Sequence, residues 1–314
     1  MRQKSKKILV INQFYMLDPK EVVKNYDVKY ILLYKHINAF LKPFRFMHQF
    51  LNLPFFHIWY RKNIELLVKG YDIIILHDAP GKQNNYFIKK ITKAADISTR
   101  LYLYYWNKID NLEQLKLNSR WKILSFDWQD SKDQNLLYVG GFFDAGLQNC
   151  SNSKNDFDVM FIGLNKGRFD DIRKIESALK ERGIITMFKL VSNKYLFSSK
   201  YSRPKSYNDV LDLVSKSKSI LDITKKGQMG LTLRPYEAIF FQKKLITNNT
   251  QIRSYDFYDN RNIFVLDGDV NFDELKKFLN SEFIDYSEKK RSQYSISAWL
   301  ERIDLELELQ NVNI

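Results

Sequence analysis

Short runs of apolar residues recur along the chain, and polar or turn-forming residues bound each run. Apolar runs of about four to eight residues are typical of strands that are buried on both faces of a parallel sheet. In the first half of the chain the expected strands are 7–12, 28–33, 71–78, 100–106 and 121–126. In the second half they are 157–162, 184–190, 219–223, 244–247 and 263–266.

Segments with a helical pattern separate most of these strands. Helices are expected over 84–95, 111–117, 170–183, 207–216, 234–242, 273–279 and 287–309, and 37–69 is mostly helical in pattern, with breaks at Pro43 and Pro54. Strands that alternate with helices indicate βαβ units. The predicted fold class is therefore α/β, with two Rossmann-like parallel-sheet domains that face a cleft.

The polar, turn-rich segment Asn149–Asp156 lies near the middle of the 314 residues and is the best linker candidate. A chain of this length corresponds to roughly two domains. We therefore expect an N-terminal domain over 1–150 and a C-terminal domain over 151–289. The helix from about 290 to 314 is expected to pack back onto the first domain.

The chain is strongly basic, with 50 Lys and Arg against 36 Asp and Glu, or +14. The first 70 residues hold 13 basic and four acidic residues, or +9. Such a field attracts nucleic acid, anionic lipid or phosphorylated substrates. The single cysteine, Cys150, cannot form an internal disulfide or a cysteine metal cluster, and it suits a reducing compartment.

The sequence shows neither a secretory signal nor an apolar run of bilayer-spanning length. We therefore expect a cytoplasmic protein, or one that is peripheral on the inner face of the cell membrane. The aromatic and basic segment 40–61 fits a membrane interface or a site for a lipid-linked acceptor. It fits equally a core helix pair whose basic side chains extend to solvent. No nucleic-acid-binding module is recognised in the sequence.

A glycine turn followed by a cationic helix start is the most informative feature of the second half. Gly230 allows a backbone to approach a ligand closely. The free N–H groups around Leu231 and Thr232 form an anion site, to which Arg234 adds a fixed positive charge. Glu237 lies one turn further on, within reach of a sugar hydroxyl. The pattern fits a nucleotide diphosphate, and it also fits a capped helix with an acidic residue near its positive end.

The run Arg234-Pro-Tyr-Glu237-Ala, followed by Lys244-Leu-Ile-Thr-Asn248, resembles the donor-site signature of GT-B glycosyltransferases. With Gly230-Leu-Thr-Leu before it, the run is similar to bacterial capsule and lipopolysaccharide glycosyltransferases. The resemblance implies that Glu237 binds the nucleotide ribose and that the loop before it binds the diphosphate. It also implies that Lys166 or Arg168, in the turn after the strand 157–162, contacts the diphosphate.

The resemblance further implies that no metal and no other cofactor is required, because backbone dipoles and basic side chains offset the diphosphate charge.

One position departs from the family. Many retaining GT-B enzymes have a second Glu eight residues before the ribose Glu, and Met229 stands there in this chain. The departure favours an inverting enzyme.

Three candidate catalytic residues follow predicted strands of the first half. An inverting transferase needs a base that removes the proton of the acceptor hydroxyl. Asp127, with Asp130 nearby, and Asp78 are the carboxylates in suitable positions, and His77 is a further candidate. Capping of a helix or turn at the strand end is the alternative role for each carboxylate. The spacing of the four histidines does not match a metal site.

These observations predict a glycosyltransferase that transfers a sugar from a nucleotide-diphosphate donor, with UDP as the first guess. The expected partners are the donor and a glycan or lipid-linked acceptor of bacterial capsule, lipopolysaccharide or exopolysaccharide synthesis, with peripheral contact to anionic membrane and no nucleic acid. The alternative is a non-catalytic basic two-domain module that binds nucleic acid or anionic membrane. Another two-domain nucleotide-sugar enzyme, such as an epimerase, is the third hypothesis.

Overall fold

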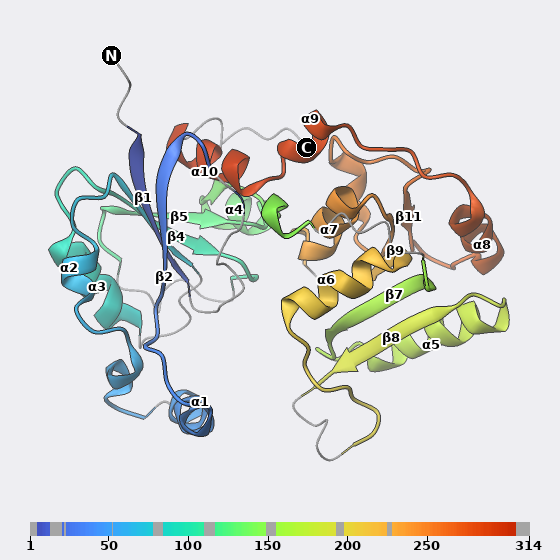
Figure 1. Cartoon of the computed structure of the whole chain (residues 1–314), viewed down its shortest axis with the longest axis horizontal. Helices are drawn as coiled ribbons and strands as arrows, with labels where there is room; N and C mark the ends of the chain where they lie inside the picture. The colour runs from blue at the N-terminus through green and yellow to red at the C-terminus, as the bar shows by residue number, and fades with distance from the viewer. Residues whose placement is uncertain are drawn as a thin grey trace. The chain divides into compact units, whose positions relative to one another are not determined.

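The computed structural model describes residues 5–12, 21, 23–51, 53–77, 84–109, 117–148, 155–192, 198–224 and 228–305. The chain forms two compact units (Figure 1). Unit 1 extends to Val139 and also includes Asp304 and Leu305, and unit 2 spans Gly140–Ile303. The division at Val139 lies some ten positions before the predicted linker, most of which is outside the described residues.

Unit 1 contains a six-stranded sheet in which all paired strands are parallel. Its strand order is β2-β1-β3-β4-β5-β6. The strands are β1 (Lys6–Asn12), β2 (Tyr26–Leu32), β3 (Ile73–His77), β4 (Arg100–Tyr105), β5 (Trp121–Ser125) and β6 (Leu137–Tyr138). Every residue of β3 is buried, as expected for a central strand that is covered on both faces.

Short helices connect the strands of unit 1. They are the 3₁₀ helices η2 (Ala39–Leu41) and η3 (Phe56–Trp59), and the α-helices α1 (Lys42–Phe50), α2 (Ile64–Leu67), α3 (Asn84–Ala94) and α4 (Trp128–Gln134). The helical pattern predicted over 37–69 therefore forms four short helices. The core on one face of the sheet joins alternate residues of the central strands to α2 and α3, for example Leu9 and Leu76 to Ile64, Phe87 and Ile91.

Unit 2 contains a five-stranded parallel sheet with the order β11-β10-β9-β7-β8. The strands are β7 (Phe157–Leu164), β8 (Thr186–Val191), β9 (Ser217–Asp222), β10 (Lys244–Thr247) and β11 (Ile263–Val265). A 3₁₀ helix, η4 (Ala145–Leu147), precedes β7, and another, η6 (Thr250–Ser254), follows β10.

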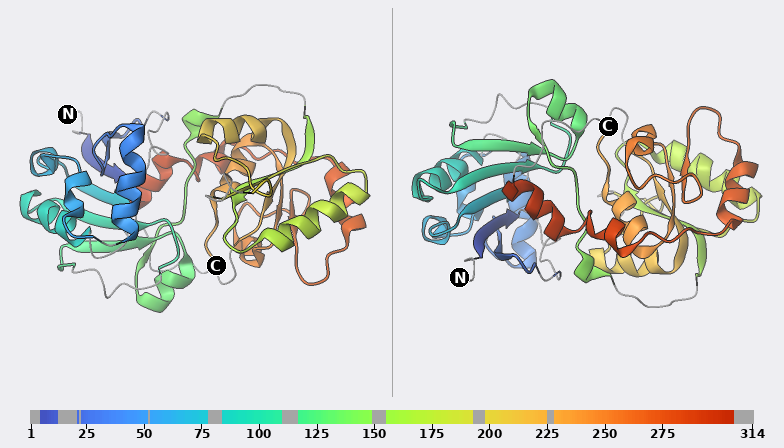
Figure 2. Two further views of the ribbon diagram at one scale, coloured as in Figure 1. Left: turned by 90° about the horizontal axis from the view of Figure 1, so that it is seen from below. Right: turned by 90° about the horizontal axis from the view of Figure 1, so that it is seen from above.

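Helices cover both faces of this sheet (Figures 1 and 2). One core cluster joins Met160 and Ile220 of the sheet to α6 (Tyr207–Ser215) and α7 (Leu233–Phe241). The other joins the intervening strand residues, such as Phe161 and Leu221, to α5 (Phe169–Glu181) and α8 (Phe272–Asn280). Because neighbouring strand residues point to opposite faces, the uninterrupted apolar runs of the sequence supply both clusters.

The single helix predicted from Ser287 to Leu309 is wrong. The chain forms α9 (Glu288–Ser292) and α10 (Ile296–Leu305), with a break between them. The backbone N–H of Phe143 donates to the carbonyl of Tyr294 at 2.9 Å, and the N–H of Ile296 donates to the carbonyl of Phe143 at 3.1 Å. These long-range hydrogen bonds form a β-bridge between Phe143 and Ser295, which interrupts the helix between α9 and α10.

The predicted α/β class with two parallel sheets is confirmed. The sequence pattern missed α4 and β6, which are short, and the helix predicted over 111–117 lies almost entirely outside the described residues.

Candidate functional site

In unit 2, the neighbouring strands β7 and β9 lie where the strand order reverses. From β7 the chain first adds β8 on one side, and it then adds β9, β10 and β11 on the other. Open parallel sheets bind ligands beyond the carboxyl ends of the strands at such a reversal. The carboxyl ends of β7 and β9 are therefore the place at which to look for chemistry.

Arg168, in the turn after β7, extends across this point. Its Nη2 donates to the carbonyl of Leu164 at 2.7 Å, and its Nη1 donates to the carbonyl of Ile223, just after β9. Burial lowers the pKa of the guanidinium, whereas the nearby Asp222 opposes this shift. Within the described part of the chain, the buried Nε of Arg168 has no hydrogen-bond acceptor.

Asp222 fixes the start of α7 at the same edge of the sheet. Its Oδ1 accepts a hydrogen bond from Thr232 Oγ1 at 2.9 Å, and its Oδ2 accepts one from Thr247 Oγ1 at 3.2 Å. Thr232 is the N-cap of α7, because its Oγ1 also accepts from the backbone N–H of Arg234 at 3.1 Å. Burial raises the pKa of Asp222, and the hydrogen bonds from the two threonines oppose this shift.

Arg234 lies in the first turn of α7 and forms an ion pair with Glu237. Its Nη2 donates to the carbonyl of Ile162 in β7 at 2.7 Å. The second oxygen of Glu237, Oε1, accepts from the hydroxyl of Tyr207 at 3.0 Å. The pKa of Tyr207 is raised well above its usual value, first by burial and then by the charge of Glu237.

The structure gives Arg234 and Glu237 different access to solvent. The side chain of Arg234 is 18% exposed, whereas that of Glu237 is completely buried. Both carboxylate oxygens of Glu237 already accept hydrogen bonds. A ribose hydroxyl can reach Glu237 only by displacing a group that now surrounds it. The geometry therefore makes Glu237 a positioning residue that holds Arg234, and it gives no support to the predicted direct contact with ribose.

The other predicted donor-site residues surround the same strand ends. Lys166 is exposed and occupies a left-handed backbone conformation (φ 40°) next to Gly167 (φ 81°), which tightens the turn before Arg168. Gly230 and Leu231 are buried, and the Leu231 side chain belongs to the core between the sheet and α7. Gly230 and Leu231 therefore offer their backbone, and not a side chain, to a ligand.

Sequence analysis missed the residues that hold this loop and the helix start. Asn249 Nδ2 donates to the carbonyl of Met229 at 3.1 Å, and Asn248 Oδ1 accepts from both the backbone N–H and the hydroxyl of Thr224. Polar residues at the ends of apolar strands were the available signal for Asp222 and for these asparagines. No sequence signal points to Tyr207.

The candidate catalytic residues of unit 1 follow β3 and β5. His77 is buried against the rings of Tyr104 and Trp106, at centroid distances of 4.9 and 6.2 Å. Burial lowers the pKa of His77 to about 3, so the ring is neutral near pH 7. Asp78 lies outside the described residues.

Asp127 is buried and acts as the N-cap of α4. Its Oδ1 accepts from the backbone N–H of Gln129 at 2.9 Å and of Asp130 at 3.4 Å. Asp130 is also buried, and its Oδ2 accepts from the N–H of Ile109 at 2.8 Å. Burial raises the pKa of Asp130. The geometry thus gives Asp127 the helix-capping role that the sequence left as the alternative to catalysis.

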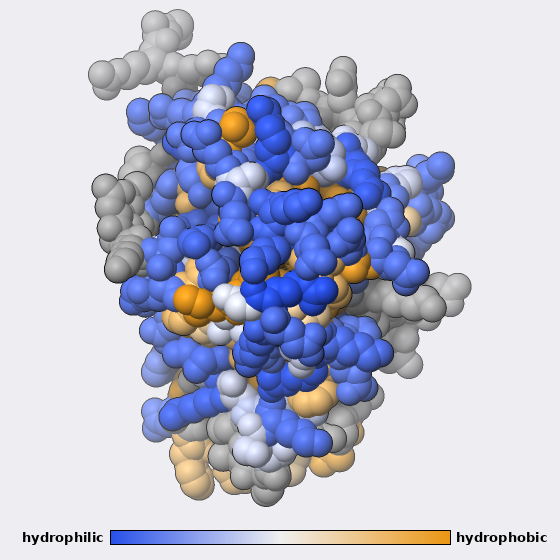
Figure 3. Space-filling view, turned by 90° about the vertical axis from the view of Figure 1, so that its right-hand side faces the viewer, coloured by the Kyte–Doolittle hydropathy of each residue, from blue (hydrophilic) through white to orange (hydrophobic). Residues whose placement is uncertain are grey.

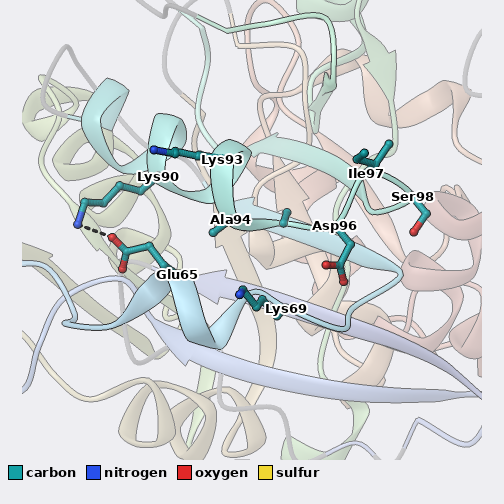
Figure 4. A pocket seen from close by; sticks show the side chains of 9 residues that line it. Glu65, Lys69, Lys90, Lys93, Ala94, Asp96, Ile97 and Ser98 are labelled. Carbon is teal, nitrogen blue, oxygen red and sulfur yellow. Dashed lines mark ion pairs between the residues drawn. The ribbon is translucent and has the colours of Figure 1, made fainter.

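A surface pocket of unit 1 lies along α2, α3 and the loop that leads into β4 (Figure 4). Glu65 and Lys90 form an ion pair at one end, and Asp96, Ile97 and Ser98 lie at the other. This loop enters the amino end of β4, so the pocket is at the sheet edge opposite to the one where parallel sheets bind ligands. We assign no function to it.

Within the described ranges, no three His, Cys, Asp or Glu side chains are grouped to hold a metal ion. None of the described helices combines the length and apolar character required to cross a bilayer.

No protein-family model matches the chain, and no curated protein matches its sequence. Among solved structures, AviGT4, a glycosyltransferase involved in avilamycin A biosynthesis, is similar with a TM-score of 0.50 and 11% identity over 96% of each chain. Anabaena Alr3699/HepE in complex with UDP is similar with a TM-score of 0.46 and 11% identity, over 96% of this chain and 99% of that chain. An α1,3-fucosyltransferase with GDP is similar with a TM-score of 0.45 and 10% identity, over 100% of this chain and 93% of that chain. The likeness to AviGT4 shows the fold and agrees with the predicted GT-B class.

Proposed function

We propose that the chain is a glycosyltransferase and that unit 2 binds the diphosphate of a nucleotide-sugar donor. One observation carries the proposal: two arginines meet at the carboxyl ends of β7 and β9. Arg168 follows β7 and bonds to a carbonyl after β9, whereas Arg234 follows β9 and bonds to a carbonyl in β7. Two guanidinium groups at the reversal of a parallel sheet suit a diphosphate.

The leaving group decides the chemistry of this site. When the bond between sugar and diphosphate breaks, negative charge develops on the diphosphate oxygen. Fixed donors that already face this position stabilise the charge without reorganisation. Arg168 and Arg234 supply them, and the backbone N–H groups at the start of α7 add to them. Exposed Lys166 is in the same turn as Arg168 and supplies a further cation.

This donor set leads us to propose a reaction that requires no metal and no cofactor beyond the nucleotide sugar. The two guanidinium groups and the helix start provide the positive charge that a metal ion supplies in other enzymes. The family resemblance supports UDP as the first donor nucleotide to test. The lack of a Glu at Met229 supports inversion of the sugar centre.

We further propose that unit 1 supplies the acceptor site and the base. His77 and Asp78 remain the candidates for the base, since Asp127 already caps α4. The neutral ring of His77 is able to accept a proton, although its lowered pKa makes it a weak base. The resemblance supports an acceptor from bacterial surface-glycan synthesis, either a glycan or a lipid-linked saccharide.

A thermal-shift screen with UDP, GDP and dTDP and their sugars tests the proposal. A ligand that binds only the folded state raises the melting temperature by mass action. One nucleotide diphosphate should give a saturable shift that persists at high salt. Binding of nucleic acid alone, with a steep loss as salt increases, would instead support the non-catalytic alternative. Product analysis without acceptor separates a transferase from an epimerase.

A further inference from the structure

The exposed apolar side chains of this protein are concentrated in one segment of unit 1. Of thirteen large apolar side chains that are exposed in the described ranges, eight lie between positions 40 and 58: Phe40, Leu41, Phe44, Met47, Leu51, Leu53, Phe55 and Ile58. We call these eight residues the apolar segment. Phe40 is 77% exposed and Phe55 is 72% exposed. Hydrophilic residues, in contrast, cover most of the face drawn in Figure 3.

In the helix of this segment, α1, two polar side chains contact buried aromatic residues. The guanidinium of Arg45 lies 4.5 Å from the centroid of the buried Tyr34 ring. The Nδ1 of His48 accepts from the indole N–H of the buried Trp59 at 2.9 Å, so its Nε2 donates to the carbonyl of Pro54 at 2.7 Å. These two polar side chains of α1, Arg45 and His48, therefore face buried rings of unit 1.

Two apolar side chains of α1, Phe44 and Met47, are exposed to solvent instead. Phe44 is 46% exposed and Met47 is 49% exposed, and the ring of Phe44 lies 5.6 Å from that of Phe40. Surface helices normally place an apolar stripe against the core and polar residues toward water. Arg45, His48, Phe44 and Met47 have the opposite arrangement. This indicates that an apolar partner covers the exposed Phe44 and Met47.

The charge around the apolar segment indicates whether a second copy of the chain or a lipid bilayer covers it. Between Lys35 and Lys62 the chain has five Lys or Arg and no acidic residue. The next acidic residue along the chain, Glu65, is paired with Lys90. A second copy of the chain would bring two surfaces of the same sign together, which is unfavourable. Apolar side chains among cations instead match the boundary of an anionic bilayer.

The place of the segment in the fold agrees with this assignment. In Figure 1 the chain passes from the carboxyl end of β2 to α1. Since β1, β2 and β3 are parallel, α1 follows the sheet edge at which β1 ends with Asn12 and β3 ends with His77. A bilayer that covers α1 therefore lies on the side of unit 1 where we propose the acceptor site.

We propose that the apolar segment is a membrane-binding surface, which inserts its aromatic and aliphatic side chains into the headgroup boundary of an anionic bilayer while the surrounding cations contact lipid phosphates. The inference depends on the geometry of unit 1 alone. Failure of nucleotide binding in unit 2 would leave it intact.

Co-sedimentation of the full chain with vesicles tests the proposal. The probes are vesicles of phosphatidylcholine with about 30% phosphatidylglycerol, and vesicles of phosphatidylcholine alone. The triple variant Phe40→Ser/Phe44→Ser/Phe55→Ser removes exposed rings only. A matched control, Ile97→Ser/Ile185→Ser, removes two exposed apolar side chains elsewhere, which are 97% and 59% exposed.

The parent protein and the control should bind the anionic vesicles, and the triple variant should bind them at least about tenfold more weakly. Lys35→Glu/Lys62→Glu should also weaken binding, because it reverses two cations beside the segment. Circular dichroism and gel filtration check that each variant remains folded and keeps its size. The proposal is overturned if the parent protein stays in the supernatant, if it binds both vesicle types equally, or if the triple variant sediments like the parent. A triple variant that changes only the oligomeric state would identify the segment as a self-association surface and also overturns it.

Discussion

The hydroxyl of Tyr207 donates to the buried carboxylate of Glu237, which lies 30 positions later in the chain. This contact links α6 to α7 and, together with Arg234, encloses the carboxylate completely. Glu237 therefore acts through its neighbours. The chemistry of the site depends on the partly exposed Arg234 that Glu237 keeps in place.

Tyr207→Phe removes the hydroxyl and leaves one oxygen of a buried carboxylate without its partner. Such a loss costs about 1–3 kcal/mol. We expect the free energy of unfolding, measured by urea titration, to decrease by this amount. Tyr71→Phe, in unit 1, serves as the control for loss of a tyrosine hydroxyl. An unchanged stability of Tyr207→Phe would show that this hydrogen bond does not hold Glu237.

Glu237→Gln tests the positioning role more strongly. The substitution removes the negative charge while an amide oxygen remains to accept from Tyr207. Breaking a buried ion pair costs about 3–5 kcal/mol, because one charge is left without its partner. Since Arg234 is partly exposed, we expect a value of about 3 kcal/mol or less, together with weaker nucleotide binding. Loss of nucleotide binding at unchanged stability would instead support the direct ribose contact that the sequence predicted.

Acid should destabilise the protein through His77. The folded protein keeps this ring neutral down to a pH of about 3, whereas the unfolded chain binds the proton below about pH 6.5. Protons therefore favour the unfolded state, and the stability is complete above pH 6.5 and decreases below it. At pH 5 the loss from this group is about 2 kcal/mol.

Urea titrations at pH 7 and pH 5 measure this loss. His77→Gln should reduce the difference between the two pH values, and substitution of the exposed His36 should leave it nearly intact. If both variants show the same pH dependence as the parent protein, the buried neutral state of His77 is wrong.

Asp127 allows a capping role to be separated from a catalytic one. Asp127→Ala should lower stability by about 1 kcal/mol, since α4 loses its N-cap, whereas Asp127→Asn should keep most of that stability. Because the cap survives in Asp127→Asn, sugar-transfer assays on this variant report on the chemistry alone. We expect it to remain active, and loss of turnover in this stable variant would restore Asp127 as the base.

The carboxylate of Asp304 joins the end of α10 to β1, β2 and β4 of unit 1. Its carboxylate accepts from Lys6 Nζ at 2.7 Å, from Tyr26 at 3.0 Å and from Arg100. Asp304→Ala leaves these donors without a common acceptor, and we expect a loss of about 2 kcal/mol, moderated by the partial exposure of the two cations. Thermal unfolding with Glu301→Ala as the control measures it, and an equal effect of both substitutions would contradict the assignment.

Sequence patterns predicted the strands well because most are buried on both faces, so that their apolar runs are continuous. β10 coincides with its predicted span, 244–247. The break before α10 was not predictable, since it depends on hydrogen bonds to Phe143, about 150 positions earlier. The same reason applies to Glu237. The sequence from Arg234 to Glu237 is the same whether the carboxylate faces solvent or the interior. The burial of Glu237 depends on Tyr207, which lies 30 positions earlier and donates a hydrogen bond to it.

Isothermal titration of the nucleotide diphosphate selected by the thermal-shift screen tests the central claim most directly. The parent protein and the control Arg261→Met, at an exposed site, should bind the diphosphate more tightly than the matching monophosphate. Arg168→Met should lose about tenfold or more of the diphosphate affinity, because a charge-assisted hydrogen-bond donor is removed, and Arg168→Lys should recover part of it. Equal diphosphate affinity in the parent protein and Arg168→Met would contradict a donor site at the carboxyl ends of β7 and β9.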